Sequence, residues 1–92
     1  MKRIIKKPHI SEKTTRLTKE QNAYVFIVNE NANKIETKEA VEDMYDVNVE
    51  KVRMVKIPSK KRRLGRIEGF KKGYKKAIVW VEEGQTIEIL SS

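Results

Sequence analysis

The stretch Ala23-Tyr24-Val25-Phe26-Ile27-Val28 decides the fold, because every one of its residues is apolar or aromatic. β-branched and aromatic side chains favour an extended backbone. A strand with one face in water would alternate apolar and polar residues, and this stretch does not. It therefore predicts a strand at residues 23–28 whose two faces are both covered by other parts of the chain.

A helix is predicted after this strand, at residues 34–45. Asn33 and Glu36 have the spacing of a capping box, in which each side chain accepts a hydrogen bond from the backbone N–H at the other position. The residues expected near its buried face are Ile35, Thr37, Ala40, Val41, Met44 and Tyr45. The charged residues between them would point outward, so this amphipathic helix is expected to cover the sheet.

Two further strands are predicted at residues 47–57 and 74–81. In the first of them the apolar alternation slips at Glu50-Lys51, between Val49 and Val52. A bulge at the slip would return both valines to one buried face. The apolar residues that follow leave the register of this strand open.

The remaining segments complete an α+β fold. Ser11 is placed to cap a short helix, and residues 86–89 predict a final strand or a tail. Pro58 ends the second main strand, and the segment 58–73 is predicted to be a long basic loop between the second and third main strands. We expect helices packed on a small, mostly antiparallel sheet, in a single domain of residues 1–92.

Charge is distributed unevenly along the chain, whose formal net charge is +8. Residues 1–19 hold seven Lys and Arg and one acid, and residues 56–76 hold ten and one. Residues 20–55 and 77–92 are acidic overall. Lys and Arg bind nucleic acids by displacing the counterions condensed on phosphates, so two basic segments on an acidic body indicate a polyanion-binding protein.

The sequence offers little for catalysis or metal binding. It contains no Cys and one His, so we expect no thiol chemistry, no cluster of metal ligands, no cofactor and no enzymatic activity. The apolar run at residues 77–81 is far shorter than the roughly 20 residues of a membrane helix. The basic N-terminus has no apolar segment behind it, unlike a secretory signal. These features predict a soluble intracellular protein with no membrane segment.

The predicted loop carries the strongest functional signal. The bases in it and just after it are Lys60, Lys61, Arg62, Arg63, Arg66, Lys71, Lys72, Lys75 and Lys76. Glycines among them let the backbone follow an irregular phosphate track, and Arg can bind a phosphate bidentately or stack on a base. Phe70 is expected to stack on RNA, with packing against the sheet edge as the alternative, and for Tyr74 that packing is the favoured interpretation.

Four ordered blocks resemble the family of the universal large-subunit ribosomal protein numbered twenty-three. Pro8-His9-Ile10-Ser11-Glu12-Lys13 is similar to the opening signature of that family, and residues 32–42 are similar to its central helix. Residues 47–52 resemble its second strand. Residues 60–69, 75–79 and 82–84 resemble its basic loop and last strand. The resemblance covers nearly the whole chain.

The resemblance implies a place on the rim of the polypeptide exit tunnel, with large-subunit rRNA and neighbouring ribosomal proteins as partners. The long basic loop resembles that of bacterial and organellar members, and the lack of a transit peptide favours a bacterial, cytoplasmic ribosome. Beyond the loop, the expected rRNA-binding residues are Lys6, Lys7, His9, Lys13 and Arg53. Arg53 stands where the family usually has Asn, so a local rRNA contact is expected to differ.

Glu12 and Trp80 each have two possible roles. Glu12 matches the glutamate that helps the family dock trigger factor and the signal recognition particle, and an equal alternative is that it complements the positive end of a helix dipole. Trp80 stands where a small or polar residue is common. It is expected on a half-covered sheet face, with a contact to rRNA or a neighbouring protein as the alternative.

A free-standing RNA-binding chaperone or regulator that used the same loop is the alternative to a ribosomal protein. Association with intact large subunits after a high-salt wash would separate the two functions.

Overall fold

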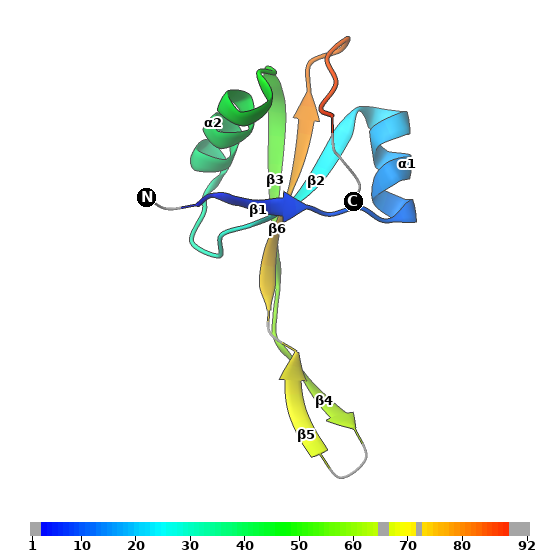
Figure 1. The fold of residues 1–92 in the computed structure, drawn as a ribbon, viewed down its shortest axis with the longest axis vertical. Helices are drawn as coiled ribbons and strands as arrows, with labels where there is room; N and C mark the ends of the chain where they lie inside the picture. Colours follow the sequence, from blue (N-terminus) through cyan, green and yellow to red (C-terminus); the bar gives the residue numbers. More distant parts are fainter. Residues whose placement is uncertain (1–2, 65–66, 72, 89–92) are drawn as a thin grey trace.

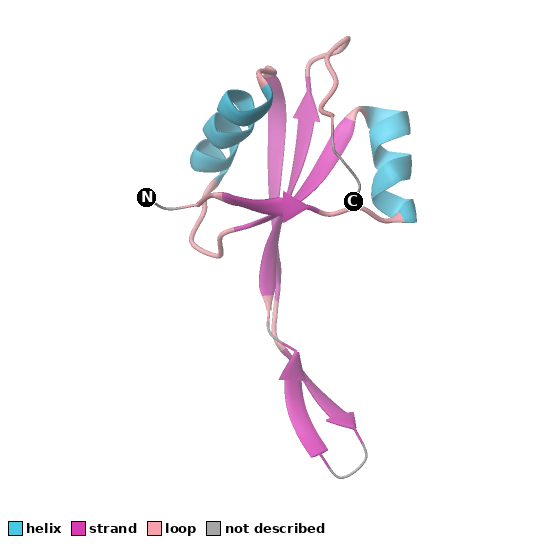
Figure 2. Cartoon of the chain, viewed as in Figure 1, coloured by secondary structure: helices cyan, strands magenta, loops and turns pink. Residues whose placement is uncertain are grey.

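The computed structural model describes residues 3–64, 67–71 and 73–88, with side chains at residues 3–59 and 73–88. Its elements are β1 Ile5–Pro8, α1 Glu12–Gln21, β2 Ala23–Val28, α2 Lys34–Tyr45, β3 Val49–Ile57, β4 Lys60–Leu64, β5 Ile67–Lys71 and β6 Tyr74–Val81. An antiparallel sheet has the order β1-β2-β6-β3, and β4 pairs with β5 in a second sheet (Figure 1). The two helices lie on either side of the view in Figure 2, α2 close to β3 and α1 beside β2. This arrangement confirms the predicted α+β class.

Strand β2 is buried along its whole length, as its composition predicted. All six of its residues are buried, and Phe26 is fully enclosed. The ring of Phe26 stacks on that of Tyr45 from α2, with 5.7 Å between the ring centroids. The core therefore forms where β2 and its neighbour β6 meet α2.

Both predicted helix caps are present. The Ser11 side chain accepts from the Thr14 N–H, and the Thr14 hydroxyl accepts from the Ser11 N–H, at 3.2 and 2.8 Å. Asn33 and Glu36 form the same reciprocal pair at the start of α2. These bonds satisfy backbone donors that a helix leaves unpaired in its first turn, so each helix begins where its cap stands.

The buried stripe of α2 is narrower than the sequence predicted. Thr37 and Val41 are buried, and Ala40 and Tyr45 pack against the core, but Ile35 and Met44 are exposed. Ile35 lies two positions before Thr37, which turns it about 200° around the helix. Met44 lies in the last turn and keeps 57% of its surface exposed.

The predicted bulge in β3 is present at Glu50. Val49 pairs with Val81 and Lys51 pairs with Trp80, so Glu50 has no partner in the register. Because of this extra residue, Val49 and Val52 are both buried in the same cluster. The bulge also decides that Lys51 faces away from the core.

One short segment differs from expectation, and another takes one of its two predicted forms. Residues 5–8 form the edge strand β1, which the sequence did not predict because Pro8 suggested a break. An edge strand tolerates proline because one side of its backbone has no strand to bond. Residues 86–88 form no strand and so agree with the tail that was the second alternative. The segment is anchored at Ile87, whose side chain is buried and whose N–H donates to the Tyr24 hydroxyl at 3.1 Å.

The basic segment between β3 and β6 was predicted as a long loop between these two strands. Within it, the described backbone forms the antiparallel strands β4 and β5. We call the paired strands β4 and β5 the hairpin. It projects from the body below β3 and β6 (Figure 1). The usual strand signal is a buried apolar face, and a hairpin rich in Lys and Arg lacks that signal.

Candidate nucleic-acid interface

The hairpin strands hold six of the predicted RNA-binding residues. Lys60, Lys61, Arg62 and Arg63 lie on β4, and Phe70 and Lys71 lie on β5. The register places Lys60 opposite Lys71. Like charges at opposed positions destabilise a strand pair, so a polyanion that neutralised them would stabilise the hairpin. The predicted contacts at Arg66 and Lys72 lie outside the described residues.

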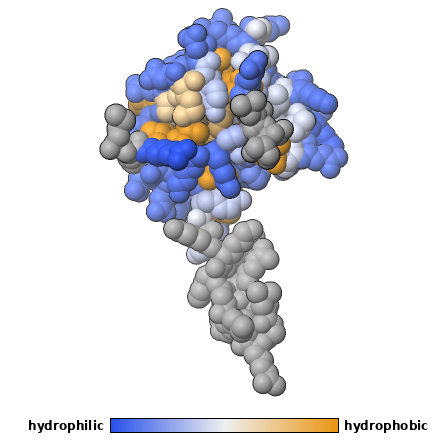
Figure 3. Space-filling model, viewed as in Figure 1, coloured by the Kyte–Doolittle hydropathy of each residue, from blue (hydrophilic) through white to orange (hydrophobic). Residues whose placement is uncertain are grey.

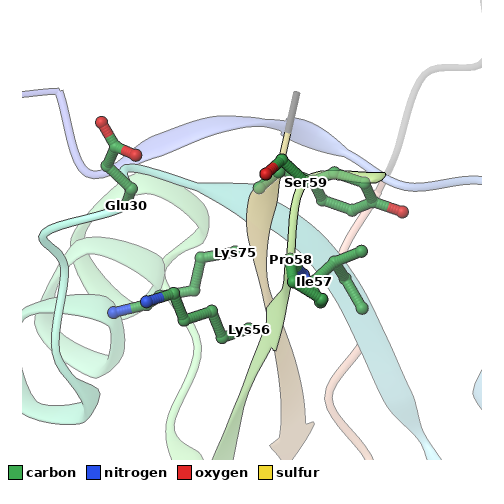
Figure 4. Close-up of a pocket in the computed structure, with 8 residues that line it drawn as sticks. Glu30, Lys56, Ile57, Pro58, Ser59 and Lys75 are labelled. Atoms are coloured by element: carbon green, nitrogen blue, oxygen red, sulfur yellow. The ribbon is translucent and has the colours of Figure 1, made fainter. Parts of the chain in front are cut away.

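A neck formed by the ends of β3 and β6 joins the hairpin to the body. Lys56 and Lys75 are cross-strand partners there, and Figure 4 shows their side chains extending to the same side. The Lys75 ammonium donates to the Ala32 carbonyl at 3.1 Å, so this predicted RNA-binding residue is held by the body. Lys56, which the sequence did not single out, is exposed. Both lysines and Glu30 line a cavity of about 200 Å³ at the neck.

Gly73 allows the two sides of the neck to approach closely. A Cβ atom at this position would lie 2.6 Å from the Ile57 carbonyl oxygen and 2.8 Å from the Ser59 nitrogen. Both contacts are far closer than van der Waals distance, and both involve backbone atoms that cannot rotate aside. The side chain of any other residue would therefore push the strands apart.

Replacement of Gly73 by alanine is expected to loosen the neck. Overpacking of this kind costs about 1–3 kcal/mol, and here the cost falls on the pairing of Ile57 with Tyr74. Amide hydrogen exchange at those two residues is expected to become faster. Gly84→Ala is the control, because Gly84 has φ 89° and no atom within 4 Å of an added Cβ, so it would strain only its own turn. Unchanged exchange at the neck in Gly73→Ala would contradict the prediction.

Three predicted residues from three strands come together on the side of the sheet that faces away from the core. Arg53 pairs with Ile78, Lys76 pairs with Ile27, and Ile27 pairs with Lys7. Directly opposed residues of antiparallel strands point to the same face. The alternate residues Ala77 and Val79 are buried in the core, which assigns the opposite direction to Lys76 and Ile78. We call Lys51, Arg53, Val55, Lys76, Ile78 and Trp80 the outer sheet face.

Lys51 and Trp80 belong to this face, although the sequence did not identify Lys51 as a binding residue. The Lys51 ammonium lies 5.0 Å from the centroid of the Trp80 ring, as in a cation–π contact. The indole N–H donates to the Gln21 side chain at 3.2 Å. Trp80 is half-buried, as its predicted place on a half-covered sheet requires. The predicted bulge was the signal that could have placed Lys51 beside it.

The other predicted residues lie along the N-terminal segment. Lys6 is exposed at the irregularity in β1, and Glu12 and Lys13 are exposed in the first turn of α1. His9 is half-buried, and its backbone N–H donates to the Val25 carbonyl at 2.8 Å. His9 and Ile10 line a groove of about 290 Å³, together with residues of α1 and β2 and Ile87. These residues lie on β1, on the segment after it and on α1, whereas the outer sheet face lies on β3 and β6.

The body presents a largely hydrophilic surface in the view of Figure 3, with apolar residues limited to small patches. Among the residues that the structure describes, no three His, Asp or Glu side chains are grouped closely enough to hold a metal ion. Neither α1 nor α2, the helices of the described part, is long and apolar enough to cross a membrane.

Comparison with known proteins identifies the family. Residues 3–89 match the family model of ribosomal protein L23. The chain is 46% identical over 87 residues to large ribosomal subunit protein uL23 of Alkalilimnicola ehrlichii, covering 95% of this chain and 88% of that protein. It is 45% identical to uL23 of Trichlorobacter lovleyi (92% and 90% covered) and 48% identical to uL23 of Rippkaea orientalis (94% and 85% covered). The chain belongs to the ribosomal protein L23 family.

Proposed function

We propose that this chain is a structural constituent of the large ribosomal subunit and binds large-subunit rRNA directly. Its family is one of ribosomal structural proteins and not of enzymes, in agreement with the sequence-based prediction. The observation that carries the proposal is the hairpin, a projecting extension whose two strands hold five Lys and Arg and one acid. Residues 1–92 would act as one rRNA-binding domain of a bacterial-type, cytoplasmic ribosome, with segment 58–73 as its extension.

The proposed rRNA contacts fall into three groups. The hairpin segment contributes Lys60, Lys61, Arg62, Arg63, Arg66, Phe70, Lys71 and Lys72, the sheet contributes Lys7, Arg53, Lys75 and Lys76, and the N-terminal segment contributes Lys6, His9 and Lys13. The exposed positions of Lys6, Lys13 and Arg53 support this assignment. Lys75 is the weakest member, because its ammonium already bonds to the Ala32 carbonyl.

A place at the rim of the exit tunnel and the docking of nascent-chain factors are part of the same proposal. Glu12 is exposed in the first turn of α1, and Ile10 beside it keeps half of its surface exposed. An exposed carboxylate next to an exposed apolar side chain and a groove can be reached by a partner protein. Trigger factor and the signal recognition particle are the partners proposed for Glu12, alongside the neighbouring ribosomal proteins.

Retention on large subunits tests the proposal. Tagged protein expressed in bacteria is expected to sediment with large subunits and to stay bound through a wash at high salt, because a ribosomal protein is held by assembled RNA and protein contacts as well as by screened charges. A free-standing RNA-binding chaperone would be released by the wash. Complete release, with no tagged protein left in the subunit fraction, would favour the chaperone.

A further inference from the structure

We propose that the outer sheet face is a second RNA-binding surface, separate from the hairpin. The inference rests on the proposed function and adds a place and a mode of contact to it. Lys51, Val55, Ile78 and Trp80 enter the RNA-binding surface here alongside Arg53 and Lys76. The RNA would lie across β3 and β6, with phosphates bound by the basic residues and with bases or riboses packed on the apolar ones.

This part of the sheet is open. Lys51 and Arg53 are exposed, and Val55, Lys76, Ile78 and Trp80 are only partly buried. Strand β2 differs, because Ala23, Val25 and Ile27 on the same side are buried. The opposite face of the sheet carries the core and Tyr45 of α2. On this side, the open positions therefore lie on β3 and β6 and, at Lys7, on the edge strand β1.

The charge on this face has one sign. Lys51, Arg53 and Lys76 are basic, and Lys7 lies in the same cross-strand row as Lys76. None of the paired positions of β3 and β6 on this side is acidic. The bulge residue Glu50 lies at one end, where it lines a cavity with Gln21 and Gly84. A polyanion that crossed these paired positions would meet basic residues and no acidic ones.

Basic and apolar residues are paired across β3 and β6 on this face. Each basic residue has an apolar cross-strand partner: Lys51 pairs with Trp80, Arg53 pairs with Ile78, and Lys76 pairs with Val55. RNA-binding sheets use this combination, because aromatic and apolar side chains pack on bases while cations bind the phosphates.

Lys51 and Trp80 are already held in position before a ligand arrives. The cation–π contact orients the ammonium, and the bond to Gln21 orients the indole. A long lysine side chain loses rotamer freedom when it binds, and a preformed contact reduces that loss. Lys51 therefore presents its charge over the indole ring of Trp80.

The chemistry favours RNA over a neighbouring protein as the occupant. Protein interfaces are depleted of lysine at their centres, whereas this face and its extension to Lys7 contain three lysines and one arginine. A protein partner would need a matching acidic surface to compensate for desolvating these charges. A phosphate backbone supplies such charge along its whole length.

The test compares two variants that lose the same charge. Lys51→Ala/Arg53→Ala removes two bases from the outer sheet face, and Lys34→Ala/Lys38→Ala removes two exposed bases from α2. Binding to a fragment of the bacterial large-subunit rRNA is measured over a salt series. If both residues bind phosphates, the first variant is expected to lose about 10–50-fold in affinity near 0.1 M salt, with a slope shallower by roughly 1.5–2. The α2 variant is expected to change by less than about threefold.

Trp80 provides an independent signal, because it is the single tryptophan of the chain. Its fluorescence is expected to change on addition of the rRNA fragment, including in a variant in which Asn-Gly replaces residues 58–73.

The inference would be overturned if Lys51→Ala/Arg53→Ala kept the affinity and the salt slope of the wild type and the Trp80 emission did not change. The outer sheet face would then be assigned to contact with a neighbouring protein. In that case, weaker rRNA binding by the variant that lacks residues 58–73 would still support the proposed function. Equal affinity of the wild type for unrelated RNA would count against the ribosomal role, while the slope and the emission would still report contact with RNA.

Discussion

Replacement of Phe26 by alanine is expected to remove about 3–5 kcal/mol from the free energy of unfolding. Phe26 has no exposed surface, lies on a strand flanked by two others, and stacks on Tyr45. Its loss would leave a cavity that backbone pairing on both sides prevents from closing. A chain of this length has roughly 5–14 kcal/mol of stability in total, so the variant would be close to unfolding.

The loss is measured as the shift of the urea midpoint at constant m-value, followed by circular dichroism. Met44→Ala is the matched control, because Met44 is apolar and lies on α2 but is 57% exposed, and its truncation is expected to change stability by less than about 0.5 kcal/mol. Burial raises the pKa of the Tyr45 phenol above its ordinary value. In Phe26→Leu, which is expected to remain folded, this pKa is predicted to fall as water reaches the ring. Equal losses in Phe26→Ala and Met44→Ala would contradict the prediction.

Local signals predicted most of the body correctly. The all-apolar composition of β2 indicated a strand covered on both faces, and Asn33 with Glu36 placed the start of α2. The slip in the β3 pattern indicated the bulge at Glu50. Each of these features depends on residues a few positions apart, so a single sequence contains the information.

Features that depend on pairing between distant residues could not be predicted in the same way. Strand β1 is four residues long with two lysines and a proline, and only its partner β2 makes it a strand. The hairpin likewise has no apolar alternation of its own. The outer sheet face needs the register of β3 against β6, because Lys51 and Trp80 are 29 positions apart in the sequence and meet only in the folded sheet.

Strands β3 and β6 connect the two proposed RNA-binding surfaces. The outer sheet face runs along them from the Lys51–Trp80 pair to the Val55–Lys76 pair, and the neck at their other end carries the hairpin. Loosening the neck by Gly73→Ala would therefore be expected to affect the hairpin's orientation and to leave Lys51, Arg53 and Trp80 in place. The two surfaces can be tested separately for this reason.

Removal of the hairpin is expected to weaken binding to a large-subunit rRNA fragment by about 10²–10³-fold near 0.1 M salt, if three or four of its bases bind phosphates. Asn-Gly in place of residues 58–73 would join Ile57 to Tyr74, which are already cross-strand partners, through a two-residue turn. With about six phosphate contacts, the wild-type slope of log affinity against log salt is expected to be roughly −4 to −5, and the variant's slope about half of that.

Charge and shape can be separated by a variant that keeps the hairpin. Glutamine at Lys60, Lys61, Arg62 and Arg63 would preserve the length of β4 and remove four charges. If phosphate neutralisation dominates, this variant is expected to reproduce most of the loss of affinity and of slope. If the apolar residues of the hairpin dominate, affinity would be retained in the glutamine variant and lost only on removal of the hairpin. Equal affinity and slope for all three proteins would place the RNA contacts on the sheet and the N-terminal segment, because the hairpin charges would then have no phosphate to neutralise.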